Sequence, residues 1–357
     1  MNKNVINKIS EVLEPTEEQK ERMFNNILEK RAQKTTKERN TKSIRRVKPA
    51  FAAALIVFCL LTTTAFAASY LGLDVNFLNF LSPSSPEQAE YLANGAYIVD
   101  KKIKNKNGTL EIKQVLGDSN LTYILIDFTA PEGIILNADR YRFDFSIDNV
   151  DNYHGSYGVG FTKLEDDNPE DNKISMIMTI NTEQSIMGGK IKLRFKGLEE
   201  AAYLPKTFDE AETRDSEEYV FKTVMTGDWS TSFNLDFKDF SRTYTPNSKV
   251  MIYDHEAMLK SLSVSPISVT VKFTSPFTKE IHELKPYEQV EYNTYLDAFP
   301  VTINYKDGSQ ETTTYANGLG LGDLLSNTTM SIKVFENMIN DKEIESIEFF
   351  DTVVIID

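Results

Sequence analysis

The residues that could carry acid–base or metal chemistry are few and scattered along the chain. Three histidines, His154, His255 and His282, lie in different segments, and none has a serine, cysteine or metal-ligand partner at a diagnostic spacing. The single cysteine, Cys59, lies in an apolar run and has no partner for an intramolecular disulfide. We therefore predict no catalytic residues, no metal site and no cofactor, and we expect that the chain is not an enzyme.

One acidic segment, "EDDNPEDN" at residues 165–172, has two interpretations. Its carboxylates could hold Ca²⁺ through oxygen ligands. However, it lacks the D-x-[DN]-x-[DN]-G order of a calcium loop, and Pro169 stands where such a loop needs other geometry. This favours a solvated loop between strands.

Most of the chain has the pattern of short β-strands. Before these, Ser85 and Gln88 form a capping box with Pro86 at the first helical position, which predicts a helix that ends at Asn94-Gly95. Runs rich in β-branched and aromatic residues then alternate with Gly, Asn, Asp and Pro clusters, as in an antiparallel sandwich. The runs are "GTLEIKQVL", "LTYILIDF", "RYRFDFSI", "KISMIMTI", "KIKLRFKG", "EYVFKTV" and "WSTSFNLDF".

A second group of strands follows near the C-terminus. In "ISVTVKFTS" the pattern places Ile267, Val269, Val271 and Phe273 on the inner face. "FPVTINYKDGSQETTTY" predicts a hairpin on an Asp307-Gly308 turn, and "TVVIID" a final strand. We expect Trp229 to be a core residue and the boundary between the two groups to fall near residues 244–248.

Charge divides the chain into two unlike parts. Residues 1–48 hold thirteen basic and seven acidic residues, a net charge of +6, and the remainder holds 26 basic and 46 acidic residues, a net charge of −20. The acidic part disfavours binding to nucleic acid, which is itself a polyanion.

The segment from Pro49 to Leu73 has no charged side chain over 25 residues, and about 20 are needed to cross a membrane. Its strongly apolar part ends at Leu61, and Ala65-Phe66-Ala67 has the form of a signal-peptidase site, so a cleaved signal is the rival interpretation. A 48-residue leader is too long for a signal peptide, which favours an uncleaved anchor. Basic residues before the span place the N-terminus in the cytoplasm. Tyr70, Phe77 and Phe80 then form an outer interfacial belt.

The leader is patterned for two short amphipathic helices, separated by Pro15. Helices of this length are marginal in water, so the apolar stripes need a partner. The membrane surface, self-association and a cytosolic protein with hydrophobic grooves are three possible partners, and a flexible tail with accidental helical pattern is a fourth interpretation. The stripes are Val5, Ile6, Ile9, Val12 and Leu13 in the first helix, and Met23, Phe24, Ile27 and Leu28 in the second.

The order of these parts resembles a known bacterial family. "EPTEEQKERMFNNILEK", a basic linker, a span ending "TTTAFAASYLG" and then "FLNFLSPSSPEQAEYLANGAYIVDKKIKNKNGTLEIKQVLGDSNLTYILIDF" are similar to Firmicute membrane proteins with the extracytoplasmic domain of unknown function 4179. The similarity covers residues 15 to about 240, and its motifs are diffuse. "LSVSPISVTVKF" and "NYKDGSQ" look like the second immunoglobulin-like domain that often follows in this family.

The resemblance implies an anti-sigma factor whose leader binds an extracytoplasmic-function sigma factor, with the matching positions Val5, Ile6, Ile9, Met23, Phe24, Ile27 and Leu28. With Val12 and Leu13 of the first stripe, these are the nine residues that we predict to bind the partner. The leader has no His and no Cys, so the zinc motif of many anti-sigma domains is absent and any sigma-binding fold is metal-free.

We therefore expect a mainly β protein with two extracytoplasmic antiparallel β-sandwich (immunoglobulin-like) domains, one transmembrane helix and a short cytosolic helical segment. The expected divisions are 1–48 (cytosolic, sigma-binding), 49–70 (transmembrane), 71–244 (extracytoplasmic β-rich domain with a short N-terminal helix) and 245–357 (C-terminal β-sandwich). The expected function is a single-pass cell-membrane regulator that binds a sigma factor inside and an unknown ligand or envelope signal outside. The alternative is a membrane-anchored or secreted cell-surface ligand-binding or adhesion protein.

The anchor interpretation makes a direct prediction about topology. Protease added to intact cells removes the region after Asp74 and leaves a membrane-bound fragment that contains the leader, detected by an antibody to residues 1–48. A soluble mature protein that begins at Ala68 would instead demonstrate cleavage after Ala67 and remove the sigma-binding hypothesis.

Overall fold

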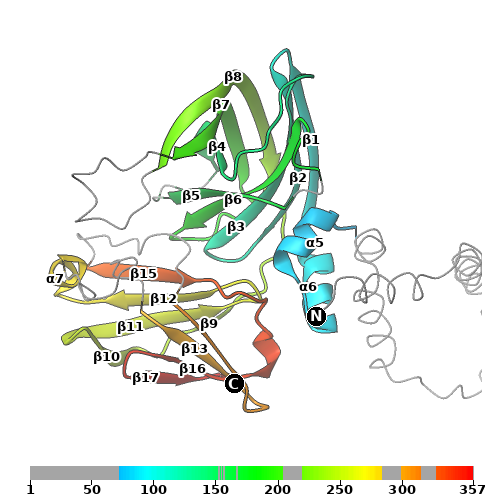
Figure 1. The fold of residues 1–357 in the computed structure, drawn as a ribbon. Coiled ribbons are helices and arrows are strands. Elements are labelled where there is room, and N and C mark those ends of the chain that lie inside the picture. Colours follow the sequence, from blue (N-terminus) through cyan, green and yellow to red (C-terminus); the bar gives the residue numbers. More distant parts are fainter. Residues whose placement is uncertain are drawn as a thin grey trace, which may run out of the picture. The chain divides into compact units, whose positions relative to one another are not determined.

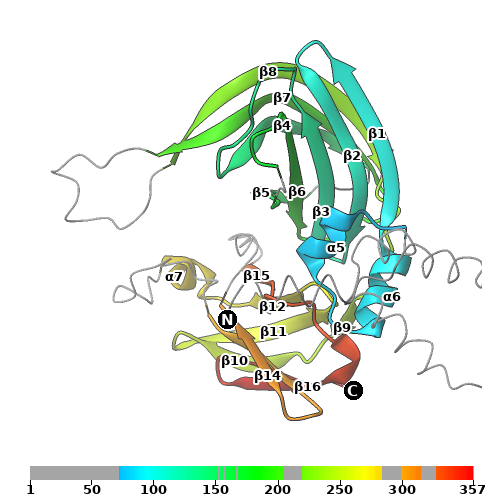
Figure 2. The same ribbon diagram turned by 45° about the vertical axis from the view of Figure 1, so that its right-hand side comes forward.

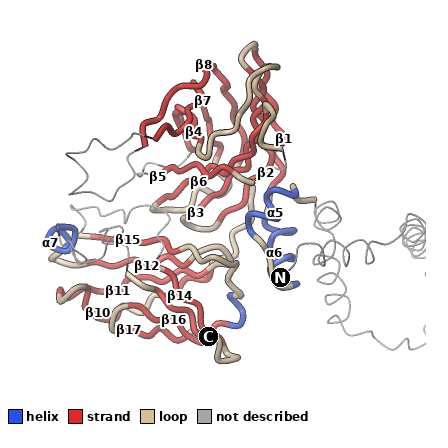
Figure 3. Tube along the Cα trace, viewed as in Figure 1, coloured by secondary structure: helices blue, strands red, loops and turns tan. Residues whose placement is uncertain are grey.

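The computed structural model describes residues 72–151, 153, 155, 157–165, 168–203, 219–283, 299–314 and 327–356. These residues are mainly antiparallel β-strands with a few short helices, which confirms the predicted mainly β class (Figure 3). The nine stripe residues of the leader and the predicted span at 49–70 lie outside the described residues. Within the described ranges, no helix is both long and apolar enough to cross a membrane.

Two short helices open the described chain, α5 (Val75–Leu81) and α6 (Pro86–Gly95). Asp74 caps α5 by accepting from the backbone N–H of Asn76 at 3.0 Å. The predicted capping box of α6 is confirmed, because the Ser85 hydroxyl accepts from the Gln88 N–H and the Gln88 side chain accepts from the Ser85 N–H. Both helix starts are thus fixed by local side-chain chemistry.

The first group of strands forms two antiparallel sheets. One sheet has the order β1-β2-β3-β6-β5 and the other β4-β7-β8 (Figures 1 and 2). The strands are β1 (Tyr97–Asn105), β2 (Gly108–Gly117), β3 (Leu121–Thr129), β4 (Tyr141–Val150), β5 (Tyr157–Lys163), β6 (Lys173–Thr182), β7 (Lys190–Tyr203) and β8 (Tyr219–Asn234).

One apolar core joins these two sheets, with Ile126 and Met178 from the first and Leu193 and Trp229 from the second. Trp229 is fully buried, as predicted, and its indole N–H donates to the Gly108 carbonyl at 3.2 Å. The ring of Phe128 meets the indole edge to face at 5.3 Å. The indole therefore combines a large apolar contribution with a satisfied polar group.

The predicted strands "EYVFKTV" and "WSTSFNLDF" are a single long strand, β8, and expecting two was wrong. The β7–β8 pairing shifts register between Phe195 and Gly197, which leaves Gly227 and Asp228 in a bulge. A Cβ atom at Gly227 would lie 2.0 Å from the ring of Trp229, so only glycine fits beneath the indole. The glycine that resembles a strand break in the sequence is therefore a bulge residue.

The second group forms two further antiparallel sheets, with the orders β10-β11-β12-β15 and β14-β13-β16-β17; β9 also pairs with β11. Short helical segments α7 (Thr278–Glu283) and η2 (Asp341–Glu343) lie among the strands. The strands are β9 (Arg242–Tyr244), β10 (Ser248–Ile252), β11 (His255–Val264), β12 (Val269–Thr274), β13 (Val301–Tyr305), β14 (Gln310–Thr313), β15 (Thr328–Lys333), β16 (Ile344–Phe349) and β17 (Thr352–Ile355).

Several predicted features of this group are confirmed. The four residues predicted to face inward, Ile267, Val269, Val271 and Phe273, are all buried. The β13–β14 hairpin turns at Asp307-Gly308, where Gly308 has a φ of 85°. The predicted domain limit between residues 244 and 245 stays a prediction, but the pairing of β9 with β11 attaches residues 242–244 to the second group.

A third apolar cluster packs the two helices against both groups of strands. It contains Phe77 of α5, Leu92 of α6, Leu125 of β3 and Ile332 of β15, and Figures 1 and 2 show α5 and α6 beside β2 and β3. The expectation that Phe77 belongs to a membrane-interface belt is wrong, because its side chain is only 1% exposed and lies in this cluster. Phe80 is partly buried and meets Tyr123 edge to face at 5.3 Å.

A buried carboxylate links the two groups of strands. Asp118, in the β2–β3 turn, accepts from the hydroxyls of Ser265 and Ser268 in the β11–β12 turn, each at 2.6 Å. Its other oxygen accepts from the backbone N–H groups of Asn120 at 2.9 Å and Leu121 at 2.8 Å. We call this arrangement the Asp118 clamp. Burial raises the pKa of Asp118, and these four hydrogen bonds oppose the rise.

The Asp118 clamp predicts a specific pH dependence of stability. The folded pKa of Asp118 lies above its unfolded value of about 3.9. The stability that comes from protonation of Asp118 is therefore complete below about pH 3.9 and is lost as pH rises through the raised folded pKa. The free energy of unfolding of the wild type, minus that of Asp118→Asn, should fall as pH rises from 3 to 7 in denaturant titrations. A difference that grows with pH would mean that the four hydrogen bonds lower the pKa of Asp118 by more than burial raises it.

Candidate functional site

The histidines of the described chain form no reactive constellation. His255 begins β11 and its ring lies 5.4 Å from that of Phe277. His282 belongs to α7, and His154 lies outside the described residues. Within the described ranges, no group of three or more His, Cys, Asp or Glu side chains could hold a metal ion.

The acidic segment at 165–172 forms local turns where it is described. Asp171 accepts from the backbone N–H of Lys173 at 2.7 Å, and its other carboxylate oxygen accepts from the Asn168 amide at 3.4 Å. Both carboxylate oxygens of Asp171 are thus engaged by residues at most three positions away, as expected for a loop between strands.

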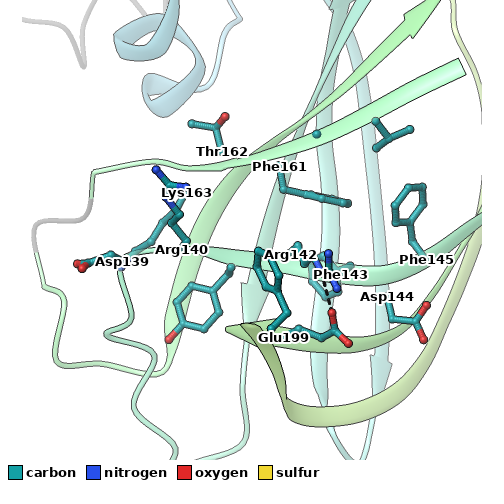
Figure 4. A pocket seen from close by; sticks show the side chains of 14 residues that line it. Asp139, Arg140, Arg142, Phe143, Asp144, Phe145, Phe161, Thr162, Lys163 and Glu199 are labelled. Atoms are coloured by element: carbon teal, nitrogen blue, oxygen red, sulfur yellow. Dashed lines mark hydrogen bonds and ion pairs between the residues drawn. The ribbon is translucent and has the colours of Figure 1, made fainter. Parts of the chain in front are cut away.

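A hollow with a volume of about 770 Å³ lies between β4 and β5. We call it the β4–β5 groove. Each of these strands is an edge strand of its sheet. The groove therefore lies where the edges of the two sheets face each other without pairing. Figure 4 shows side chains from β4, β5 and the neighbouring residues around the hollow. The position of the groove follows from the order of the strands in each sheet. Alternating apolar residues predict that a strand exists, but they do not give this order.

Aromatic rings form the apolar part of the β4–β5 groove. Phe161 of β5 meets Phe145 at 5.4 Å and Phe143 at 6.1 Å, both edge to face. Phe143 is almost fully buried and also packs on Phe195 at 5.0 Å, whereas Phe145 and Phe161 are partly exposed. The exposed edges of these two rings offer an apolar surface to a ligand.

The charged side chains of the groove are held in place by neighbours. The Arg142 Nε donates to Glu199 at 2.7 Å, and its guanidinium lies 3.9 Å from the centre of the Phe221 ring (Figure 4). Lys163 donates to the Ala138 carbonyl at 2.8 Å. The groove is lined by three basic and three acidic residues, which are Arg140, Arg142, Lys163, Asp139, Asp144 and Glu199.

This arrangement suits binding better than chemical catalysis. Its formal charges balance, Arg142 and Lys163 are paired or hydrogen-bonded, and its apolar surface is largely aromatic. A neutral or zwitterionic ligand with a flat apolar face fits these properties. The groove has no signature in the sequence: "RYRFDFSI" predicts a strand, but nothing in it indicates that the strand lies at a sheet edge.

The nine residues predicted to bind a partner are not tested by this geometry. Val5, Ile6, Ile9, Val12, Leu13, Met23, Phe24, Ile27 and Leu28 all lie outside the described residues.

Comparison with known proteins adds little. No family model matches the sequence, and no curated protein matches it. Among solved structures, a chain described as "The crystal structure of the conserved domain protein from Bacillus anthracis" is similar over 71% of this chain and 75% of that chain, with a TM-score of 0.46 and 12% identity. A similarity this distant supports no conclusion about fold or function.

Two substitutions in the groove should differ in their effect on the free energy of unfolding, because Phe143 stabilises the fold whereas Arg142 lies at the exposed surface of the groove. Phe143→Ala removes a buried ring and should cost about 3–5 kcal/mol of the free energy of unfolding. Arg142→Ala removes a side chain that is 48% exposed, and should cost under about 1 kcal/mol because exposed ion pairs contribute little. Denaturant titration measures both values, and equal losses would contradict this division of roles.

Proposed function

We propose that this chain is a single-pass membrane regulator of the anti-sigma-factor type. Residues 1–48 bind an extracytoplasmic-function sigma factor in the cytoplasm, residues 49–70 span the membrane, and the β-rich part receives an envelope signal outside. The observation that carries the proposal is the order of segments: a striped basic leader of net charge +6, an uncharged apolar run, and an acidic β-rich part. The resemblance to proteins with domain of unknown function 4179 supports the same assignment.

The start of the folded part gives further support. Leu73 is 8% exposed and belongs to the cluster that holds α5 and α6. The predicted span ends at residue 70, so only two residues separate it from this buried leucine. Under this proposal, a rearrangement of the β-rich part would be transmitted to the span, because the packed cluster begins only two residues after it.

We also propose that both β-rich parts are immunoglobulin-like sandwiches. In the first part, β2 to β8 taken in chain order as A to G give the sheets ABED and CFG, with β1 added at an edge. In the second part, β11 to β17 taken as A, B, C, C′, E, F and G give the sheets ABE and C′CFG. Domains of this kind commonly present ligand-binding surfaces, which suits an exterior that receives a signal.

The alternative function is a cell-surface ligand-binding or adhesion protein whose leader serves only as an anchor. The β4–β5 groove favours it, because a hollow of about 770 Å³ with exposed aromatic edges is suited to binding by itself. The two functions differ in what the leader does.

Substitution of the second leader stripe tests the regulator function. If Phe24 and Leu28 insert into a hydrophobic groove, each buried side chain contributes roughly 1.5–3 kcal/mol. Changing both to Asp should weaken the complex by at least about a hundredfold, since each 1.4 kcal/mol is a factor of ten. Transcripts of the sigma factor's own targets should rise without any external signal, as measured by quantitative reverse-transcription PCR.

The matched controls are Asn25→Ala and Asn26→Ala, on the polar face of the same predicted helix. These should change transcription much less, because exposed polar contacts are usually worth under about 1 kcal/mol. The abundance and membrane insertion of each variant are compared by immunoblot. Unchanged transcription in the double variant, with the sigma factor expressed, would favour the surface-binding alternative.

A further inference from the structure

The edge strand β17 has exposed apolar side chains on its outer face. Within the described residues it pairs with β16 alone, so one side of it is open (Figure 1). Val353 is 55% exposed and Ile355 is 64% exposed, whereas Val354 and Ile356 are buried. Side chains two positions apart lie on the same face of a strand. Val353 and Ile355 therefore form one apolar strip, which we call the β17 strip.

The backbone groups of the β17 strip also point to the open side. The Ile356 N–H donates to the Glu345 carbonyl at 2.9 Å, so Ile356 forms its backbone hydrogen bonds toward β16. Hydrogen-bonded and non-hydrogen-bonded pairs alternate along an antiparallel ladder. The register of β17 with β16 has no shift, so Val354 also bonds to β16 and the two residues of the β17 strip do not. Each of these two residues thus offers one N–H and one carbonyl to a further strand.

Two other edge strands of this protein are protected against such pairing. Strand β1 has three lysines, Lys101, Lys102 and Lys104, and a register shift. In β10, the N–H of Met251 donates to the Asp351 carboxylate at 3.2 Å. Lysines, prolines and bulges keep natural edge strands from pairing with other chains. Strand β17 has no lysine, no proline and no bulge, so its edge lacks this protection and is open to a further strand.

The surroundings of the β17 strip are acidic. Residues 344–356, which include β16 and β17, contain Glu345, Glu348 and Asp351 and no Lys or Arg. All three acidic residues are exposed, and Glu348 lies opposite Val353 in the β16–β17 pair. A second copy of this chain would add its own three carboxylates at the same edge, and like charges oppose such pairing. A strand with basic side chains is favoured instead.

We propose that the edge of β17 binds an extended, basic segment of a partner protein by strand addition. The backbone of this segment pairs with Val353 and Ile355, and its alternate β-branched side chains pack on the β17 strip. Its flanking Lys or Arg side chains lie near Glu348 and Asp351. Backbone hydrogen bonds supply affinity in this binding mode, and side chains supply specificity. The site is independent of the leader and does not require that the chain bind a sigma factor.

Three peptides test this binding mode on the full chain in nonionic detergent micelles. The probe is the capped peptide Lys-Thr-Val-Thr-Val-Thr-Lys, whose valines and lysines share one face of a strand. One control peptide replaces both lysines by glutamate, and the other has a methyl group on both valine nitrogens. Ligand-observed NMR titration, with empty micelles as the blank, should give saturable binding of the probe with a Kd on the order of 1 mM or below. The glutamate peptide should bind roughly tenfold more weakly, because its charges repel the acidic edge. The methylated peptide should not saturate, because it lacks the N–H groups that pair with β17.

Val353→Lys should weaken binding of the probe at least about fivefold, because it replaces an apolar contact by a charge that repels the peptide. The matched control is Ile98→Lys in β1, where the isoleucine is 57% exposed. This control makes the same change of charge at a similarly exposed apolar side chain, and it should leave probe binding unaltered. Circular dichroism checks that both variants fold, and the methylated peptide tests the wild-type chain itself.

Four results would overturn the proposal. The first is no saturable binding of the probe. The second is equal binding of the probe and the methylated peptide, which would mean that backbone pairing is not involved. The third is binding of the glutamate peptide as tight as that of the probe, or an equal loss of probe binding in Val353→Lys and Ile98→Lys. The fourth is a dimer of the full chain, seen by analytical ultracentrifugation, that Val353→Lys abolishes, because the edge of β17 would then belong to a second copy.

Discussion

A buried carboxylate needs hydrogen-bond donors in place of water. At Asp118 this requirement links the two groups of strands, because each group supplies donors. Two of its donors belong to its own β2–β3 turn and two to the β11–β12 turn, about 150 residues further along the chain. Hydrogen bonds to a charged group are among the stronger ones in proteins, and leaving a buried charge without them is costly. The two turns are therefore bound to each other in one geometry.

The helices depend on this junction. The third apolar cluster combines α5 and α6 with Leu125 of β3 and with Met330 and Ile332 of β15, so it needs both groups of strands in place. A polar contact adds to it, since the Gln88 side chain caps α6 and also donates to the Met338 carbonyl at 2.6 Å. The residues that follow the predicted span are consequently packed between two β-rich parts. Under the proposed function, this packing is the route by which an external event reaches the membrane.

Sequence patterns predicted the local features well, because local chemistry determines them. The capping box at Ser85, the alternation of apolar residues from Val269 to Phe273 and the turn at Gly308 each have a signature in a few neighbouring residues. The features that were missed depend on distant residues. The bulge at Gly227 exists because the pairing of β8 with β7 shifts register between Phe195 and Gly197. Phe77 is buried because strands from both groups surround it. The Asp118 clamp and the β4–β5 groove are products of tertiary contacts and have no signature in the linear sequence.

We claim that α5 and α6 are locked to both groups of strands. Hydrogen exchange of the full chain in micelles, read by mass spectrometry, tests this claim. Amides such as Leu78, which donates to the Asp74 carbonyl, and Ala89, which donates to the Ser85 carbonyl, report on the two helices. If the claim is correct, peptides that cover residues 75–95 exchange as slowly as those of β3 and β15, because they open only with the whole unit. Rapid exchange of both helices, while β3 and β15 stay protected, would contradict it.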